Sequence, residues 1–317
     1  GQMCIRDSLY SFNYDYHNSN LCKLESRMIF NEEEKGKVMF SNTKVDPSIS
    51  PFIKNRIELI TSSESYPELI EKIAQENIKI EGFKAVYTIL EGDQTDYDER
   101  RLKLRDVGYN ITGYPNFETP SITYTICTFK NTWYFGILTK HNSDWQKHKK
   151  KPLSFSNSIS MDIAKSLVCI ASKGDKSMRL LDACCGVGTI MLEACVSNFN
   201  IEGCDINLKR TEHTQQNLDH YNYKASIHCS DIKNLNKRFD AAIVDLPYNL
   251  YSISDEITTT NIIDSTAKLA DRVIIVSTTD IETTLKTSGL KTVDFCIVEK
   301  RGKSKFERKI WVCEQDI

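Results

Sequence analysis

The sequence predicts an α/β protein in two halves: an α+β first half, and a second half built on a mostly parallel sheet with an antiparallel last strand. Three observations predict this fold. The chain has 317 residues, more than one hydrophobic core usually supports. A polar, basic stretch at residues 140–152 separates two regions of different pattern. Beyond it, strand and helix patterns alternate, and this alternation requires parallel strands with helices on both faces of the sheet.

The first half combines short strands and helices. Alternating apolar and polar residues predict a strand at 9–16, and helical spacing predicts a helix at 20–30, followed by a strand at 37–41. We interpret residues 1–49 as a small β-α-β unit. The next expected elements are helices at 50–62 and 66–78, a strand at 83–90, a helix at 96–107, and a hairpin of 121–129 with 132–139 closed by Lys130-Asn131.

The second half starts with an amphipathic helix at 160–172. The expected strands that follow are 179–182, 200–205, 225–229, 239–244 and 271–277, separated by helices at 189–196, 209–220 and 255–269. Residues 291–300 and 306–313 are expected to form a final antiparallel hairpin at the sheet edge. The predicted regions are therefore a unit at 1–49, a domain at 50–140, a basic linker at 141–154 and a domain at 155–317.

Composition excludes several classes of protein. Hydrophobic residues at 40% and charged residues at 26% are typical of a globular protein. No apolar run is long enough to span a membrane, and the N-terminal residues do not resemble a secretory signal. The 11 cysteines show no spacing typical of a metal site, so we expect no metal and free thiols in a reducing cytoplasm. A net charge of −2 excludes a uniformly basic nucleic-acid binder.

A glycine-containing turn joins a strand to a helix in the sequence Leu-Leu-Asp-Ala-Cys-Cys-Gly-Val-Gly-Thr at 180–189. Glycine lets the backbone approach a ligand closely, and the N–H groups at a helix N-terminus attract anionic groups. Such a turn is also common as plain structure, so alone it is a weak indication of a cofactor. The candidate cofactor-binding residues of this turn are Asp182, Cys184, Gly186, Gly188 and Thr189.

Acidic residues end the next two strands. Asp205 follows the second strand, where a carboxylate accepts hydrogen bonds from ribose hydroxyls. Asp231 follows the third strand and is expected to accept a hydrogen bond from the adenine amino group, with Ile206 and Ile232 flanking the ring. Each acid alone is equally compatible with a turn or a helix cap. Acids after three consecutive strands, counting Asp182, favour a nucleoside-containing cofactor.

A nicotinamide dinucleotide is the alternative cofactor. The turn lacks the full glycine set of a dinucleotide-binding loop, and Asp182 precedes it. A carboxylate at this position suits the ammonium group of a methionine moiety better than it suits a pyrophosphate. The predicted cofactor is therefore S-adenosylmethionine.

The fourth strand leads into Asp245-Leu246-Pro247-Tyr248. An amino group on a nucleic-acid base is a poor nucleophile because its lone pair is delocalised into the ring. If Asp245 and the backbone carbonyl of Leu246 or Pro247 accept its hydrogens, the lone pair becomes localised on nitrogen. Proline stiffens the turn and has no N–H, and Tyr248 offers a flat surface for a base removed from its stack. These four residues are the candidate catalytic residues.

Residues 179–248 resemble the amino-methyltransferases that carry an (Asp/Asn)-Pro-Pro-Tyr motif, with Leu246 in place of the first proline. Residues 151–170 and the element order of 50–139 are similar to the tRNA guanosine-N2 methyltransferases that carry a THUMP domain. The resemblance implies a Rossmann-like class I methyltransferase domain, preceded by a ferredoxin-like unit and a THUMP-like RNA-binding domain. It also implies that Phe155 and Ser158 lie near the cofactor.

Clusters of basic residues are candidates for RNA contact. The residues expected to contact RNA are Arg100, Arg101, Lys147, Lys149, Lys150 and Lys151, and a further cluster lies at 300–309. The resemblance implies tRNA as the substrate, methylated at guanosine N2 at a position-10-type site, in the cytoplasm. A ribosomal-RNA guanosine-N2 methyltransferase, a DNA adenine or cytosine amino-methyltransferase, a non-enzymatic RNA-binding protein and a requirement for a small activating subunit all stay open.

Overall fold

The computed structural model describes residues 8–155, 158–247, 253–299 and 307–317. It divides into two compact units. The predicted α/β class is confirmed, since both units contain a sheet covered by helices. The first unit consists of Gly1–Asn13, Glu34–Ser48 and Phe52–Asn142, and the second of Tyr14–Glu33, Ile49–Pro51 and Ser143–Ile317.

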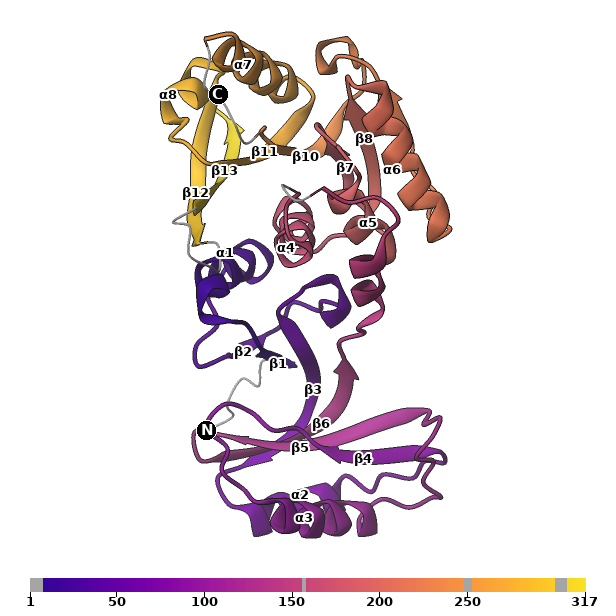
Figure 1. The fold of residues 1–317 in the computed structure, drawn as a ribbon. Helices are drawn as coiled ribbons and strands as arrows, with labels where there is room; N and C mark the ends of the chain where they lie inside the picture. The colour runs from indigo at the N-terminus through magenta and orange to yellow at the C-terminus, as the bar shows by residue number, and fades with distance from the viewer. Residues whose placement is uncertain (1–7, 156–157, 248–252, 300–306) are drawn as a thin grey trace. The chain divides into compact units, whose positions relative to one another are not determined.

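The first unit is a six-stranded sheet with the order β2-β1-β3-β6-β5-β4, in which β4 runs parallel to β5 and the other pairs are antiparallel. Two helices cover one face of this sheet (Figure 1). The elements are β1 (Ser8–Phe12), β2 (Val38–Ser41), η2 (Pro47–Ile49), β3 (Ile53–Ser63), α2 (Tyr66–Gln75), β4 (Phe83–Tyr87), α3 (Tyr97–Tyr109), β5 (Ile122–Phe129) and β6 (Thr132–Lys140).

The helix expected at 50–62 was wrong, because most of this segment is the central strand β3. Ile53 and Ile57 are both buried at the i, i+4 spacing that also occurs in helices. In a strand, however, the same two residues share one face by the period of two. Pairing with β1 on one side and β6 on the other decides between the two structures, and this pairing is not visible in the local pattern.

The hairpin of β5 and β6 is confirmed, with Lys130 and Asn131 between the strands. Both residues have positive φ angles, 49° and 63°. A two-residue turn of this kind matches the right-handed twist of the flanking strands, although it holds a non-glycine residue at each position.

Residues 1–49 do not form a separate unit. Strands β1 and β2 belong to the sheet of the first unit, since β1 pairs with β3. Helix α1 (Ser19–Phe30), with η1 (Tyr16–Asn18) before it, groups instead with the second unit, where it packs on helix α4 and strand β12. The reason is that α1 residues such as Leu21 and Leu24 are buried within the second unit, and not on the first unit's sheet that contains β1 and β2.

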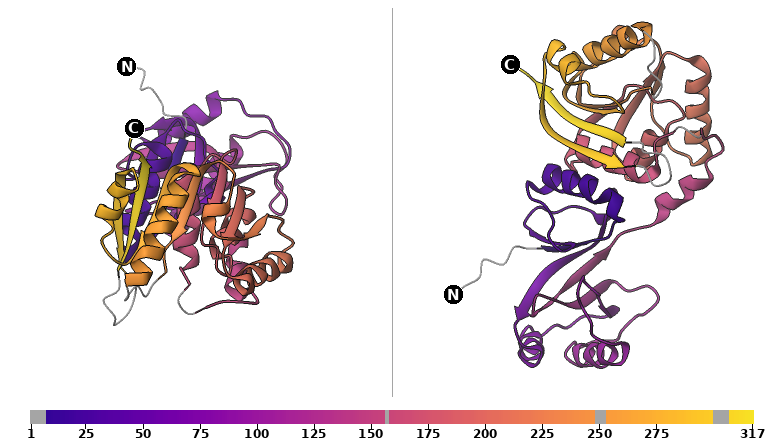
Figure 2. Two further views of the ribbon diagram at one scale, coloured as in Figure 1. Left: turned by 90° about the horizontal axis from the view of Figure 1, so that it is seen from above. Right: turned by 60° about the vertical axis from the view of Figure 1, so that its left-hand side comes forward.

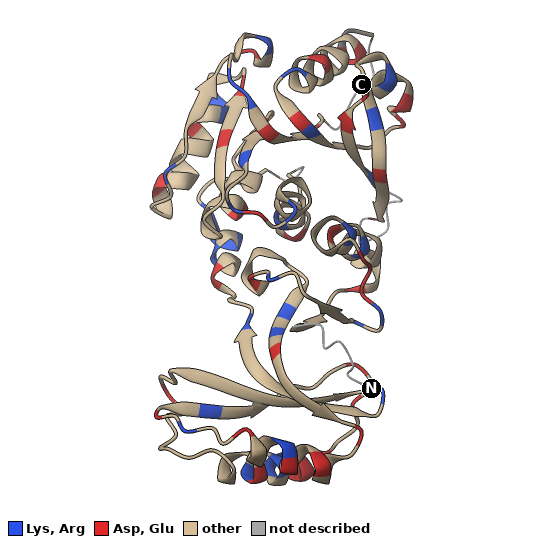
Figure 3. Ribbon diagram, turned by 180° about the vertical axis from the view of Figure 1, so that it is seen from behind, with Lys and Arg blue, Asp and Glu red and all other residues tan. Residues whose placement is uncertain are grey.

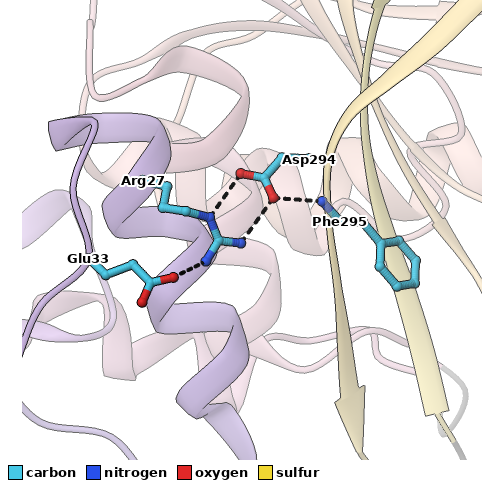
Figure 4. A network of polar contacts seen from close by, with 4 residues as sticks. All are labelled: Arg27, Glu33, Asp294 and Phe295. Atoms are coloured by element: carbon cyan, nitrogen blue, oxygen red, sulfur yellow. Dashed lines mark hydrogen bonds and ion pairs between the residues drawn. The ribbon is translucent and has the colours of Figure 1, made fainter.

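An arginine on α1 fastens the helix to strand β12 (Figure 4). The Arg27 guanidinium donates from Nε and Nη2 to the two carboxylate oxygens of Asp294, each at 3.0 Å. Its Nη1 donates to Glu33 at 2.7 Å, and Asp294 also accepts from the backbone N–H of Phe295. Bidentate charge-assisted bonds of this kind are stronger than bonds between neutral groups.

We expect Arg27→Met to destabilise the second unit by about 1–2 kcal/mol, because it keeps the apolar stem but removes the bonds to Asp294. The measurement is the thermal unfolding midpoint. Glu33→Gln is the matched control: it alters the more exposed acid of the network and should change the midpoint little. Equal effects of the two variants would show that Asp294 contributes no more than an exposed ion pair.

The second unit is a seven-stranded sheet with the order β12-β13-β11-β10-β7-β8-β9. The strands from β11 to β9 are parallel, and β13 is antiparallel to β11 and β12, as predicted. Both views of Figure 2 show this edge hairpin in yellow. The elements are α4 (Met161–Ser172), β7 (Arg179–Asp182), α5 (Thr189–Val196), β8 (Asn200–Asp205), α6 (Leu208–His220), β9 (Ile227–Cys229), η4 (Ile232–Asn234), β10 (Phe239–Asp245), α7 (Ile253–Ala267), β11 (Ala270–Ser277), α8 (Glu282–Thr287), β12 (Leu290–Glu299) and β13 (Glu307–Gln315).

The segment expected as a polar linker is partly folded onto the second unit. Residues Asp144–Lys150 form the 3-10 helix η3, in which Trp145 and His148 are buried. His148 is hydrogen-bonded through Nδ1 to Glu193 and through Nε2 to the hydroxyl of Tyr223, each at 2.8 Å. The buried side chains of Trp145 and His148 hold this lysine-rich segment in place. The prediction of a linker relied on the average polarity of the segment and therefore missed the helix.

No helix in the described part of the chain is long and apolar enough to cross a membrane. The same residues contain no cluster of three or more histidine, cysteine or acidic side chains suited to a metal ion.

Candidate active site

The predicted strand-end acids meet at one edge of the second sheet. β7, β8 and β10 are parallel neighbours that end at Asp182, Asp205 and Asp245. The chain order reverses between β7 and β10, since β8 and β9 continue to one side and β11 to the other. Such a switch point, at the carboxyl ends of the strands, is where open α/β sheets bind ligands.

The surroundings of two of these acids raise their pKa values. Burial, with the nearby negative charges of Asp245 and Asp205, raises the pKa of Asp182 to about 8, although a bond from the Cys184 N–H opposes the shift. Burial also raises the pKa of Asp245 to about 6, while the positive charge of Arg308 lowers it. A strongly shifted pKa at the switch point is typical of a functional site.

The cofactor turn has the backbone geometry that its glycines predict. Gly186 and Gly188 have φ angles of 55° and 87°, in the left-handed region that glycine tolerates. A Cβ at Gly188 would lie 2.8 Å from the side chain of Thr214, whereas no atom lies within 4 Å of a Cβ built at Gly186. Gly188 is therefore required by packing, and Gly186 faces open space.

Asp205 holds this turn against the end of β8. Its carboxylate accepts from the backbone N–H of Gly186 at 3.1 Å and from that of Asn207 at 2.9 Å. Each carboxylate oxygen keeps further acceptor capacity, so bonds to ribose hydroxyls remain available.

The other predicted cofactor residues differ in exposure. Asp231 caps η4 through the N–H of Lys233 and is half-buried. Ile206 is 70% exposed, but Ile232 is only 7% exposed and packs in the core with Leu181 and Leu246. Ile206 therefore presents an apolar side chain at the edge, while Ile232 presents little surface.

Phe155 and Ser158 lie before α4. Phe155 is 53% exposed, its ring lies 5.9 Å from the ring of His213 on α6, and its carbonyl accepts from the N–H of Ser158. Phe155 therefore lies beside α6, the helix whose next residue, Thr214, contacts the cofactor turn. Ser158 is half-buried.

Two residues that support the turn were not predicted from the sequence. Thr214 donates from Oγ1 to the carbonyl of Gly186 at 2.6 Å. Asn217 donates to the carbonyls of Val187 and Leu153 and accepts from the N–H of Leu153, so it ties the segment before α4 to the turn. The available signal was the spacing of polar residues along the buried side of an otherwise charged helix.

We expect Thr214→Val to weaken cofactor binding about fivefold, because a buried hydrogen bond that shapes the turn is worth about 1 kcal/mol. Calorimetric titration with S-adenosylmethionine measures this. Thr211→Val is the matched control, since the Thr211 hydroxyl donates to the carbonyl of Leu208 within the same helix and not to the turn. Equal affinities of the two variants would show that the turn does not depend on Thr214.

The residues present fit S-adenosylmethionine. Oδ1 of Asp182 is buried without a hydrogen-bond partner in the described structure, as is Oγ1 of Thr189 at the start of α5. An unpaired buried acceptor at Asp182 is suited to an ammonium group, and the open side of Gly186 leaves room for a ligand. Cys184 is half-buried in the same turn.

The catalytic motif is only partly described. Asp245 ends β10, the backbone N–H of Leu246 donates to Val276 on β11, and Pro247 is exposed. The side chain of Leu246 packs in the core, so the leucine that replaces the usual proline stabilises the base of the turn. Tyr248 lies outside the described residues.

The predicted RNA contacts fall on both units. Arg100 bonds to the carbonyl of Thr95, and Arg101 is exposed beside Tyr97. Helix α3 carries acidic as well as basic residues (Figure 3). On η3, Lys149 and Lys150 are exposed, Lys151 is half-buried with a pKa lowered by burial, and Lys147 lies over the rings of Tyr221 and Tyr223.

Comparison with known proteins identifies the second unit. Residues 149–293 match the sequence family UPF0020, described as RMKL-like, methyltransferase domain. This part of the chain is a methyltransferase domain. The prediction of a methyltransferase is confirmed for this part of the chain.

A curated relative matches part of the same chain. The tRNA (guanine(10)-N2)-dimethyltransferase of Methanothermobacter thermautotrophicus is 29% identical over 120 residues, which cover 36% of this chain and 35% of the relative. The match thus spans only about a third of that relative's length. It agrees with the class of methyltransferase that the sequence resembles.

Solved structures show weaker likeness. TrmN from Thermus thermophilus has a TM-score of 0.47 at 14% identity, covering 97% of this chain and 99% of that one. A predicted N6-adenine-specific DNA methylase from Listeria monocytogenes has a TM-score of 0.45 at 13% identity, covering 96% and 95%. At these scores no inference about substrate follows.

Proposed function

We propose that the protein transfers a methyl group from S-adenosylmethionine to the exocyclic N2 amino group of a guanosine in tRNA, at a position-10-type site, in the cytoplasm. The observation that carries the proposal is the acidic turn after β10: Asp245 ends the strand beside Asp182, across the switch point of the sheet. The curated relative named for guanine-10 N2 dimethylation supports the choice of base and of RNA.

The chain's own residues account for cofactor binding. Asp182 receives the positively charged ammonium group, Asp205 accepts from ribose hydroxyls, and Asp231 accepts from the adenine amino group. The backbone at Gly186 and Gly188 permits close approach. S-adenosylmethionine supplies a methyl group made electrophilic by the positively charged sulfur.

The turn after β10 activates the acceptor nitrogen. The Asp245 carboxylate accepts one amino hydrogen, and the carbonyl of Leu246 or Pro247 accepts the other, which localises the lone pair on nitrogen. Since Leu246 is anchored to β11 and proline has a fixed φ, these acceptors are held in place before the substrate arrives. The amino proton then leaves to Asp245 or to water.

We further propose that lysines of η3 and the arginines of α3 contact the phosphate backbone. Exposed Lys149 and Lys150 are free of the packing that holds His148 beside them, and exposed lysines on a folded helix can bind phosphates without reading sequence.

Mass spectrometry of nucleosides tests the proposal. In a strain that lacks this gene, N2-methylguanosine in tRNA should decrease and should return when the gene is restored. Purified protein should methylate tRNA and should fail on tRNA whose guanosine 10 is replaced by adenosine. Loss of the modification only from ribosomal RNA, or loss of N6-methyladenine from DNA, would overturn the proposal.

A further inference from the structure

The charged residue Arg308 on strand β13 has no part in the methyl transfer proposed above. Arg308 lies near the start of β13, the strand that runs antiparallel beside β11. Asp245 is level with Val276 on β11, which is in turn level with Ile310 on β13. Arg308 therefore lies two strands from Asp245 and two residues further toward the edge where the parallel strands end.

Arg308 and Asp245 also share a face of the sheet. Val244 and Leu246 pack in the same core cluster as Trp311 and Cys313. Because successive side chains of a strand point to opposite faces, Asp245 and Arg308 both lie on the other face. Neighbouring strands lie roughly 4.8 Å apart, so the backbones of β10 and β13 are separated by roughly 10 Å, within reach of a long arginine side chain.

The described groups around the Asp245 carboxyl group, apart from Arg308, are acidic or uncharged. The Asp182 carboxyl group lies at the end of β7, and the Cys184 thiol lies in the turn that follows. Burial and the neighbouring acids raise the pKa of this thiol. Val276 beside Asp245 on β11 is uncharged, and α4 has exposed Asp162 in its first turn. Burial favours a protonated Asp245, whereas the positive charge of Arg308 favours the ionised form.

We propose that Arg308 is a positioning residue that holds the Asp245 carboxylate ionised, and so able to accept an amino hydrogen, while the site contains no substrate. This inference rests on the proposed function for the role of Asp245 as acceptor. It assigns a role to the antiparallel strand β13, which brings a cation to the catalytic turn that β10 carries.

The pH dependence of methyl transfer in single-turnover experiments tests the role. A protonated Asp245 is a weaker hydrogen-bond acceptor than the carboxylate, so activity falls as the pH falls through the pKa of this group. In Arg308→Gln we expect the acid limb of the profile to move upward by about one pH unit. Activity at pH 6 should then fall severalfold while activity at pH 8.5 changes little. Arg308→Lys should restore most of the wild-type profile.

Lys309→Gln is the matched control. It makes the same change of charge one residue along, on the opposite face of the strand, where Lys309 pairs with Glu307 at 3.8 Å. The acid limb of its pH profile should lie at the same pH as that of the wild type. A uniform loss of activity at every pH in Arg308→Gln, without a moved acid limb, would overturn the proposal and indicate a contact with RNA or a structural role.

A second measurement does not depend on activity. The carboxyl carbon of Asp245, identified by its absence in Asp245→Asn, can be followed by NMR through pH in protein without ligand. We expect its midpoint to rise in Arg308→Gln and not in Lys309→Gln. An unchanged midpoint would overturn the inference even if tRNA is the substrate, and a raised midpoint would support it even if the tRNA assignment fails.

Discussion

Replacing Asp245 by alanine is expected to reduce methyl transfer by a factor on the order of 10²–10³ or more, with the affinity for S-adenosylmethionine nearly unchanged. In the proposed mechanism Asp245 accepts a hydrogen of the substrate amino group, whereas Asp182 and Asp205 hold the cofactor. Single-turnover transfer to tRNA and calorimetric titration with the cofactor measure the two quantities separately.

Two further variants sharpen this prediction. Asp271→Ala removes an exposed acid near the start of β11, at the opposite end of the parallel strands from the candidate site. Asp271 pairs with Arg238 there, and this variant should leave transfer unchanged. Asp245→Asn keeps one acceptor oxygen and removes the titrating group. It should therefore retain measurable transfer and lose the decrease in activity near pH 6 that the raised pKa of Asp245 predicts. A collapse of cofactor affinity in Asp245→Ala would show that this residue belongs to the cofactor site instead.

The parts of the site that could be predicted are those fixed by local order along the chain. In a parallel sheet every strand ends at the same edge, so residues after consecutive strands come together whatever the lengths of the helices between them. This is why Asp182, Asp205 and Asp245 could be placed from sequence. The turn with Gly186 and Gly188 was predictable for the same reason, since it joins one strand to the next helix.

The parts that could not be predicted depend on pairing between distant segments. Thr214 reaches the turn only because α6 packs against it, and Arg308 reaches the level of Asp245 only through the register of the antiparallel strand β13. Helix α1 was expected in the right place in sequence, yet its partners, α4 and β12, lie far along the chain. The β3 segment shows the same limit, because the spacing of Ile53 and Ile57 fits a helix and a strand equally well.

The affinity for S-adenosylmethionine is expected to rise with pH, by up to tenfold per pH unit, between about pH 5.5 and 7.5. Asp182 has its pKa raised to about 8 without ligand, so it is mostly protonated in this range and must lose its proton to receive an ammonium group. Titrations above pH 7.5 are less informative, because the amino group of the ligand itself begins to titrate there. Asp182→Asn should bind more weakly and show little pH dependence, while Asp219→Asn, an exposed acid on α6, should behave like the wild type.

The same residue should influence stability in the opposite direction. The pKa of Asp182 rises from an ordinary value of 3.8 to about 8 on folding, so its protonated form stabilises the fold. This contribution is complete below about pH 4 and is lost progressively as the pH rises to about 8, at about 1.4 kcal/mol per unit. In the absence of ligand, Asp182→Asn should therefore raise the thermal midpoint relative to the wild type more at pH 8 than at pH 5. Equal midpoint differences at the two pH values, together with a flat affinity of the wild type, would show that Asp182 is already ionised and is not the group that receives the cation. A site that binds a cation through a buried acid must be less stable when empty, and this cost should be visible in the unfolding of the free protein.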